Sequence, residues 1–291
     1  MSVSEHIKWA MDTMVYAFFK TVPRRTFSRL LGWGSAVESG RNVHRFAIDV
    51  FSRVYGVDAS EAEFDLSEYR TLNHFFTRRL REGARTVASD SHAVVSPTDS
   101  TVVQIGMAEG SRLIQAKGLT YEIEELVGSP LAAEWFADGT FVTLYLRPRD
   151  YHRVHCPVDG TVEEVLWMPG ERYPVIPIMV NRRDRLYARN ERLSVILDSP
   201  LGKVAVVMVA SIGVGNMSLS WGEGFRTGAQ RHVGPLRLVG MEGYSLKKGT
   251  EFGVFHLGST VVLLFQEGRV GLHRLVEGQR VTVGQALAEA L

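Results

Sequence analysis

The fold is indicated most clearly by residues 193–211, which read LSVILDSPLGKVAVVMVAS. Two runs of apolar and β-branched residues stand on either side of Asp, Ser, Pro and Gly, residue types that favour turns. The same pattern of short apolar runs separated by turn residues begins at about Ala93. The strands that it predicts are 101–105, 141–146, 161–167, 193–198, 204–211 and 261–265. We therefore expect a β-rich body after the first third of the chain.

The first third of the chain instead carries apolar residues at helical spacing. Helices are predicted at residues 7–19, 43–55 and 72–80. On one side of the second helix we expect Phe46, Val50, Phe51 and Val54. Together with the β-rich body, this pattern predicts an α+β fold.

Residues 1–55 are more basic than the rest of the chain. They carry eight basic and four acidic side chains, a net +4, whereas all 291 residues together carry +1. Basic residues next to Trp and Phe suit a helix that lies in an anionic membrane interface. A helical cap whose apolar face packs on the body would have the same composition, so the charge pattern alone leaves both interpretations open.

The bulk composition limits the classes of protein that need to be considered. A net charge of +1 gives no reason to expect a nucleic-acid partner. Cys156 is the single cysteine, so an internal disulfide cannot form and a reducing compartment is the simplest inference. No apolar run reaches the ~18–20 residues of a spanning helix, and the N-terminus lacks the features of a signal peptide. We expect a soluble or peripheral protein rather than an integral one.

Several familiar catalytic motifs are absent from the sequence. There is no Walker loop, no GxGxxG after a strand, no HExxH, no paired CxxC and no GxSxG elbow. Three short segments that could carry chemistry remain: 96–99, 148–155 and 257–260.

Each of these segments has an ordinary structural interpretation when it is taken alone. Asp99 ends a proline-containing turn, where an acid most often caps its own backbone. His152 and His155 are three residues apart and could bind a metal, but no third ligand stands out, so no metal is predicted. Gly258-Ser259-Thr260 leads into an apolar run, as many turns before a strand do.

The three segments together, in this order, resemble those of the phosphatidylserine decarboxylases. The likeness extends from about residue 27 to the C-terminus, and the one clear departure is Asp99-Ser100, where the family usually has Asp-Gly. The stretches that carry the resemblance are Ser-Pro-Thr-Asp (96–99), Arg-Asp-Tyr-His-Arg-Val-His (149–155), Leu-Gly-Ser-Thr (257–260), and the flanks 69–76, 115–118 and 186–192.

The resemblance implies that the catalytic group is a pyruvoyl group grown from Ser259. The serine hydroxyl attacks the carbonyl of Gly258 to give an ester, and β-elimination then splits the chain and leaves dehydroalanine. With water entering, dehydroalanine loses ammonia and becomes a ketone. By the same resemblance, His155 is the base of this reaction and Asp99 its partner, while His152 serves in the later decarboxylation. The products of the cut are a β chain, 1–258, and an α chain, 259–291, which stay associated without a covalent bond.

The resemblance also sets expectations for substrate, location and domains. The substrate is phosphatidylserine in the bilayer, and the products are phosphatidylethanolamine and CO2. A lipid substrate favours the membrane interpretation of the N-terminus. We expect residues 1–85 to form a helical, membrane-interface region and 86–291 a β-rich catalytic domain. The enzyme would be a homodimer, peripheral on the cytoplasmic face of the cell membrane.

The residues alone also leave three other functions open. A serine hydrolase could use Asp99, His155 and Ser259 on an external ester, and its chain would stay uncut. A non-catalytic binding module is suggested by residues 277–285, which resemble a biotinyl/lipoyl-type hairpin without its attachment lysine. The same pyruvoyl chemistry could also act on a soluble amino acid.

Overall fold

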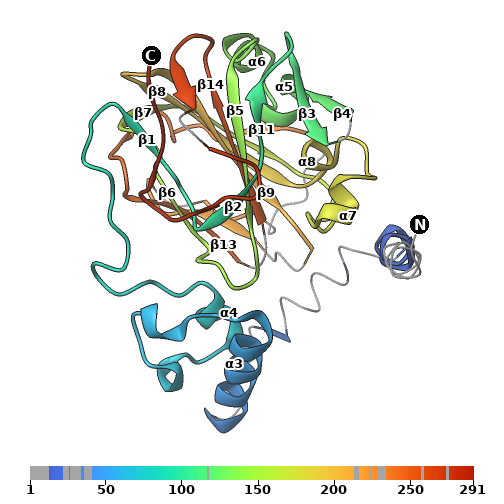
Figure 1. The fold of residues 1–291 in the computed structure, drawn as a ribbon, viewed down its shortest axis with the longest axis vertical. Coiled ribbons are helices and arrows are strands. Elements are labelled where there is room, and N and C mark those ends of the chain that lie inside the picture. The colour runs from blue at the N-terminus through green and yellow to red at the C-terminus, as the bar shows by residue number, and fades with distance from the viewer. Residues whose placement is uncertain are drawn as a thin grey trace.

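The protein has a β-rich body and a smaller helical unit, which lies below the body in Figure 1. The computed structural model describes residues 13–21, 26, 34–35, 41–116, 118–212, 216–222, 225–227, 234–256, 259–272 and 275–291. The β-rich body predicted from the sequence is confirmed, and each of the predicted strands is present to within two residues at either end.

A large antiparallel sheet forms the centre of the body. Its order is β11-β7-β8-β9-β14-β5-β2-β16, and β12 also pairs with β7. The strands are β2 (Ser100–Met107), β5 (Thr140–Leu146), β7 (Gly160–Met168), β8 (Arg192–Ser199), β9 (Gly202–Ala210), β11 (Leu236–Arg237), β12 (Ser245–Leu246), β14 (Ser259–Phe265) and β16 (Arg280–Val281).

The central strands are buried on both faces, which explains their continuous apolar runs. In β9, Val204, Val206 and Met208 belong to one core, whereas Ala205 and Val207 belong to the other. Successive side chains of a strand point to opposite faces, so a sheet covered on both sides needs apolar residues at every position.

Smaller sheets cover the first of these faces. Their orders are β1-β17-β15 and β10-β13-β6, whereas the separate β3–β4 hairpin contributes Leu113 and Tyr121 to the core on the opposite face. The strands are β1 (Ala93–Val95), β3 (Arg112–Ala116), β4 (Leu119–Glu122), β6 (Arg153–His155), β10 (Met217–Leu219), β13 (Glu251–Phe255), β15 (Val270–Leu272) and β17 (Ala286–Ala290).

Four short helices cover the opposite face, and the sequence analysis did not predict them. They are α5 (Ile123–Val127), α6 (Pro130–Trp135), α7 (Pro177–Val180) and α8 (Leu186–Arg189). With four to six residues each, they are too short to develop a clear helical period.

Gln115 holds the α7–α8 corner in place. Its amide nitrogen donates to the carbonyls of Val180 and Arg183 at 2.7 and 2.8 Å, and the Leu186 N–H donates to its amide oxygen at 2.6 Å. The flanking segments 115–118 and 186–192 therefore meet through a buried amide, so at this corner they have a structural role.

The helical unit has a small core of its own. It contains α3 (Arg41–Tyr55), α4 (Leu72–Phe76) and the 3₁₀ turns η1 (Ala59–Glu61) and η2 (Leu66–Glu68). Its core is Ile48, Ala62, Tyr69 and Phe75, with Phe51 packed against them.

Two details predicted for this unit are wrong. Phe51 does not share a face with Phe46, Val50 and Val54, which are all exposed, because it turns inward onto Phe75. The third helix ends at Phe76 rather than at residue 80, and Leu80 instead forms a β-bridge with Ala62.

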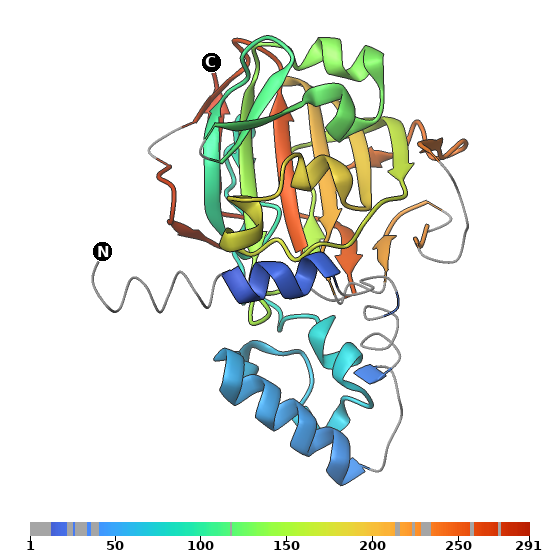
Figure 2. The same cartoon turned by 90° about the vertical axis from the view of Figure 1, so that its right-hand side faces the viewer.

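Residues 13–21 form a helix that lies between the helical unit and the body in Figure 2. Tyr16 and Phe19 pack against the core of the body, whereas Met14 and Phe18 are exposed. The remainder of the helix predicted at 7–19 lies outside the described residues. Among the described helices, none has the length and apolarity needed to cross a bilayer.

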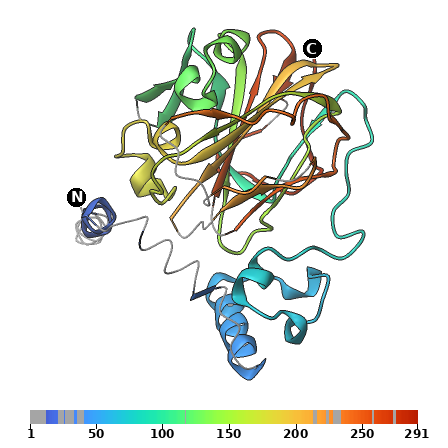
Figure 3. The same cartoon turned by 180° about the vertical axis from the view of Figure 1, so that it is seen from behind.

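Residues 77–92 connect α4 to β1 along the outside of the molecule, as Figure 3 shows from behind. The segment is held at both ends by backbone hydrogen bonds. The Arg81 N–H donates to the Glu61 carbonyl at 2.9 Å, and the Ala88 N–H donates to the Gly284 carbonyl at 2.9 Å. This places Arg85, midway along the segment, between the helical unit and the body.

Candidate active site

Ser259 is the first residue of β14, in the middle of the central sheet. It pairs with Leu146 of β5 on one side and Ala210 of β9 on the other. Its side chain is fully buried, and its Oγ has no hydrogen-bond partner among the described residues. A buried hydroxyl without a partner costs about 1–3 kcal/mol, so such an atom in a native fold requires an explanation. Gly258, the other predicted cleavage residue, lies outside the described residues.

His152 lies at the same end of the sheet as Ser259. The Phe255 N–H donates to the His152 carbonyl at 3.0 Å, and Phe255 precedes Ser259 by only four residues. Four residues span at most roughly 14 Å, so the two predicted site residues lie within one small region.

The His152 ring has one bonded nitrogen and one open nitrogen. Nδ1 lies 2.7 Å from the Asp150 carbonyl, which can only accept, so Nδ1 carries the hydrogen in the neutral ring. The ring stacks on Phe76 with centroids 3.9 Å apart, and Nε2 has no partner among the described residues. Complete burial lowers the pKa of His152 to about 3, so the ring is neutral at pH 7 with a free lone pair on Nε2.

This burial predicts an acid-sensitive fold. Below pH 6.5 the unfolded chain protonates His152 while the folded protein does not, so stability falls as the pH drops from 6.5 towards 3. From pH 7 to pH 5 we expect His152 to contribute a loss of about 2 kcal/mol in the free energy of unfolding. Urea unfolding of the uncut Ser259→Ala protein at the two pH values measures this loss. Adding His152→Gln should make the pH dependence smaller, and an unchanged dependence would contradict the assignment.

His155 is also held by its Nδ1. This nitrogen lies 2.7 Å from the Gly249 carbonyl, and Nε2 lies 3.3 Å from the Tyr151 hydroxyl. Burial lowers the pKa of His155, and burial raises the pKa of Tyr151 to about 12, so at neutral pH the phenol keeps its proton and donates to Nε2. The nitrogen that would act as a base is therefore occupied by Tyr151 in this arrangement.

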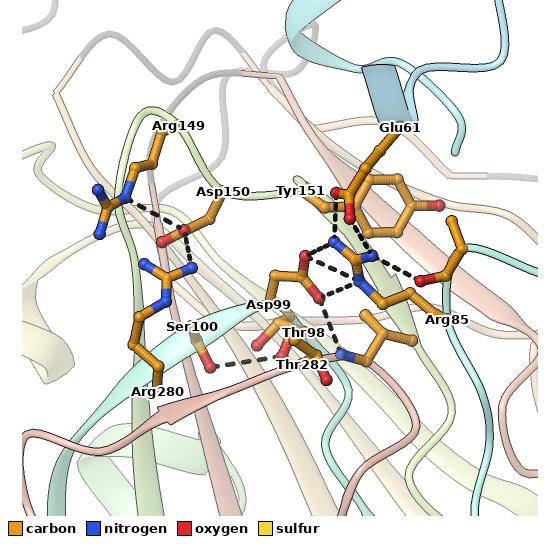
Figure 4. Close-up of polar contacts among 12 residues, drawn as sticks. Glu61, Arg85, Thr98, Asp99, Ser100, Arg149, Asp150, Tyr151, Arg280 and Thr282 are labelled. Carbon is orange, nitrogen blue, oxygen red and sulfur yellow. Dashed lines mark hydrogen bonds and ion pairs between the residues drawn. The ribbon is translucent and has the colours of Figure 1, made fainter. Parts of the chain in front are cut away.

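Asp99 lies close to His155 but is held by other groups. The His155 N–H donates to the carbonyl of Pro97, two residues before Asp99. Both Asp99 oxygens accept from the Arg85 guanidinium at 2.5–3.1 Å, and Oδ1 also accepts from the Val283 N–H at 2.8 Å (Figure 4). The structure brings Asp99 and His155 together through the backbone, and their pairing as acid and base stays a prediction.

Arg85 was not identified by sequence reasoning. It lies in a charged stretch, residues 78–85, that has the composition of an ordinary solvated surface. In the structure it also binds Glu61 at 2.7–2.8 Å and is largely buried, and both carboxylates raise its pKa. No spacing rule connects position 85 to 61 or 99, so only the fold reveals this contact.

Two pockets adjoin the site, and the larger has a volume of about 620 Å³. Its walls include Tyr55, the last residue of α3, and Tyr145, which pairs with Thr260 next to Ser259. Arg147 and Arg149 also line it. The pocket thus extends from the helical unit to β5, the strand that pairs with the start of β14.

Sequence comparison with known proteins places the chain in a family. A sequence model of phosphatidylserine decarboxylase matches residues 72–289. The chain belongs to this family. Three similar proteins are phosphatidylserine decarboxylase proenzymes. Those of Yersinia enterocolitica (39% identical) and Erwinia tasmaniensis (38%) align over 97% of this chain and 98% and 96% of their own length. That of Anaeromyxobacter sp. (38%) aligns over 96% and 99%.

The match covers the phosphatidylserine decarboxylase motifs on which the sequence analysis relied. The segments 96–99, 149–155 and 257–260 all fall between residues 72 and 289. The family resemblance noted from these motifs is therefore confirmed. The word proenzyme in the relatives' names denotes a precursor that is processed.

Proposed function

We propose that the protein is a carboxy-lyase that decarboxylates phosphatidylserine to phosphatidylethanolamine, with a catalytic carbonyl made from its own Ser259. The buried, unpartnered hydroxyl of Ser259, at the same end of the sheet as a neutral histidine with an open Nε2, carries this proposal. The proenzyme names of its relatives agree with it.

The residues present fit a pyruvoyl group at position 259. Ser259 supplies the hydroxyl that must attack the preceding carbonyl, and the backbone pairing to Leu146 and Ala210 fixes where the new chain end lies. Once formed, the ketone would take up the electron pair that remains when the substrate carboxylate leaves as CO2.

Two histidines have separate tasks in this proposal. His155 takes the Ser259 proton during self-cleavage, which requires that Tyr151 give up its hydrogen bond to Nε2, and Asp99 supports this step. His152 positions the substrate carboxylate end or moves the proton that must reach the α-carbon after CO2 leaves. His155 uses the acceptor Nε2 of its neutral ring, whereas Nε2 of His152 must first take up a proton, because a lone pair neither donates to a carboxylate nor supplies a proton.

A serine hydrolase is not supported. The chain of a hydrolase would stay uncut, and in the uncut chain Ser259 is fully buried within a central strand, where an external ester does not reach it. The relatives are decarboxylase proenzymes rather than esterases.

Intact mass spectrometry of the purified protein tests the cleavage chemistry. Overall, elimination adds one water to the precursor and releases one ammonia, whereas hydrolysis only adds the water. We expect two chains, 1–258 and 259–291, with the smaller one about 17 Da lighter than a simple hydrolysis fragment. A single uncut chain with decarboxylase activity, or a fragment with the hydrolysis mass, would refute the proposal.

The two chains should stay together after the cut. The α chain begins with β14, which pairs with β5 on one side and β9 on the other along its length. Its side chains belong to both cores of the body. Removing it would therefore take out a central strand. A homodimer remains a prediction from the family resemblance.

The exposed side of α3 is the best candidate for membrane contact. Phe46 and Val54 are each 70% exposed, and Val43 and Val50 continue the same stripe at helical spacing. Arg45 and Arg53, both exposed, lie on the same helix and suit anionic lipid. Because Tyr55 ends α3 and lines the larger pocket, lipid bound at α3 would lie next to that pocket.

We propose a division into a membrane-interface region, 1–85, and a catalytic domain, 86–291. The separate core of the helical unit supports it. We propose peripheral binding at the cytoplasmic face of the cell membrane.

Removing the apolar stripe should weaken membrane binding. With Phe46→Ser and Val54→Ser together, we expect at least about tenfold weaker sedimentation with phosphatidylserine-containing vesicles, because each large side chain contributes ~1.5–3 kcal/mol when buried. Leu131→Ser is the matched control, since Leu131 is a 59% exposed apolar residue in α6, at the far end of the molecule (Figure 1). Equal sedimentation of both variants would rule out α3 as the contact.

A further inference from the structure

A polar cleft of about 290 Å³ lies between the helical unit and the candidate site. Asp99 and Tyr151 line it on the site's side, and Glu61 lines it on the helical side. Its arginines are Arg78, Arg85, Arg149 and Arg280. The cleft therefore combines several cations with the groups expected to act on the substrate.

Three of the four arginines already have a carboxylate. Arg85 binds Glu61 and Asp99, as described above. Arg280 lies 2.8 Å from Asp150, and Arg149 lies 3.9 Å from the same carboxylate (Figure 4). These cations are therefore neutralised by the protein itself.

Arg78 differs from the other three. It is only 4% exposed, and no carboxylate of the described residues lies within 4.0 Å of it. Its guanidinium donates to the carbonyls of Arg149 and Phe75 at 3.2 and 3.5 Å and lies over the Phe75 ring, while its Nε has no partner among the described residues. Burial lowers its pKa, which reflects the cost of a charge held without a counter-ion.

Arg78 is also close to the residue expected to act in decarboxylation. The neighbouring Phe76 stacks on the His152 ring, and the positive charge of Arg78 contributes to the lowered pKa of His152. An anion bound at Arg78 would therefore lie beside His152.

We infer that Arg78 binds an oxyanion of the lipid head group, either its phosphodiester or its serine carboxylate. The inference rests on the proposed function, because it assigns a task to a residue of the same site. A guanidinium offers a planar fork of donors that matches both oxyanions. The bound oxyanion would supply the counter-ion that the protein does not provide, and it would occupy the open Nε.

The test measures binding without turnover. The Ser259→Ala protein is titrated calorimetrically with glycerophosphoserine and with glycerophosphoethanolamine, which lacks the carboxylate. We expect Arg78→Gln in this background to weaken binding by about tenfold or more, as the loss of a charged hydrogen bond predicts. Arg112→Gln is the matched control, because Arg112 is exposed on β3 and paired with Glu122, so its affinity should not change.

The pattern across the two compounds identifies the oxyanion. Weaker binding of both assigns Arg78 to the phosphodiester, and weaker binding of glycerophosphoserine alone assigns it to the carboxylate. Undiminished binding of both by folded Arg78→Gln protein, or no millimolar binding by its parent, overturns the inference. If circular dichroism finds Arg78→Gln unfolded, Arg78→Lys replaces it, and binding equal to that of the parent is then the overturning result. Failure of the proposed function would appear separately, as a wild-type chain that is never cut.

Discussion

Replacing Ser259 by alanine is expected to leave one uncut chain of 291 residues and to abolish decarboxylation. Alanine has no hydroxyl to attack the preceding carbonyl, and no oxygen to leave in the elimination, so neither the cut nor the ketone can form. The fold should survive, because the Ser259 hydroxyl makes no hydrogen bond within the described residues and the substitution removes only one buried atom. Gel electrophoresis and release of labelled CO2 from phosphatidylserine measure the two effects.

Ser194→Ala is the control for this experiment. Ser194 is equally buried in β8 of the same sheet, and its Oγ also has no partner among the described residues. We expect this variant to be cut and to remain active. Residual CO2 release by the uncut Ser259→Ala protein would show that the catalytic group does not come from Ser259.

The strands could be predicted from the sequence because burial on both faces of the sheet leaves a strong local signal. Runs such as 204–210 are apolar at every position for this reason. The short helices α5 to α8 leave no such signal. The inward position of Phe51 could not be predicted either, because α3 has apolar residues on both its exposed face and its buried face. Only the contact between Phe51 and Phe75 shows that Phe51 belongs to the buried face.

The site residues that could be predicted lie in short sequence motifs, whereas those that were missed are defined by contacts between distant parts of the chain. His152, His155 and Asp99 stand in recognisable motifs, and the structure places them in one region. Arg78 and Arg85 stand in a basic stretch that looks like solvated surface, yet both are largely buried. Apart from the local contacts with Phe75 and Ala84, their partners are 14 to 71 residues away along the chain, a range over which a single sequence offers no rule.

The second large effect is expected from Arg85→Gln. Asp99 is 4% exposed, and Arg85 is the cation that neutralises it while also reaching Glu61 in the helical unit. Removing one partner of a buried ion pair leaves an uncompensated charge and typically costs about 3–5 kcal/mol. We expect this loss in urea unfolding of the Ser259→Ala background, together with a large decrease in the rate at which the otherwise wild-type precursor is cut.

Two further variants distinguish the effect of Arg85 on Asp99 from its effect on the overall stability of the fold. Glu61→Gln removes the outer, more exposed partner and leaves the Arg85–Asp99 contact, so it should lose less stability and still be cut at close to the wild-type rate. Arg85→Lys keeps the positive charge but cannot donate hydrogen bonds from two nitrogens to the Asp99 oxygens. Its rate of self-cleavage should therefore lie between those of Arg85→Gln and wild type. The rates are read as the appearance of the 259–291 fragment after synthesis in vitro. If Arg85→Gln folds and is cut as fast as Glu61→Gln, Asp99 does not need Arg85 for self-cleavage, and the contact serves only to join the helical unit to the body.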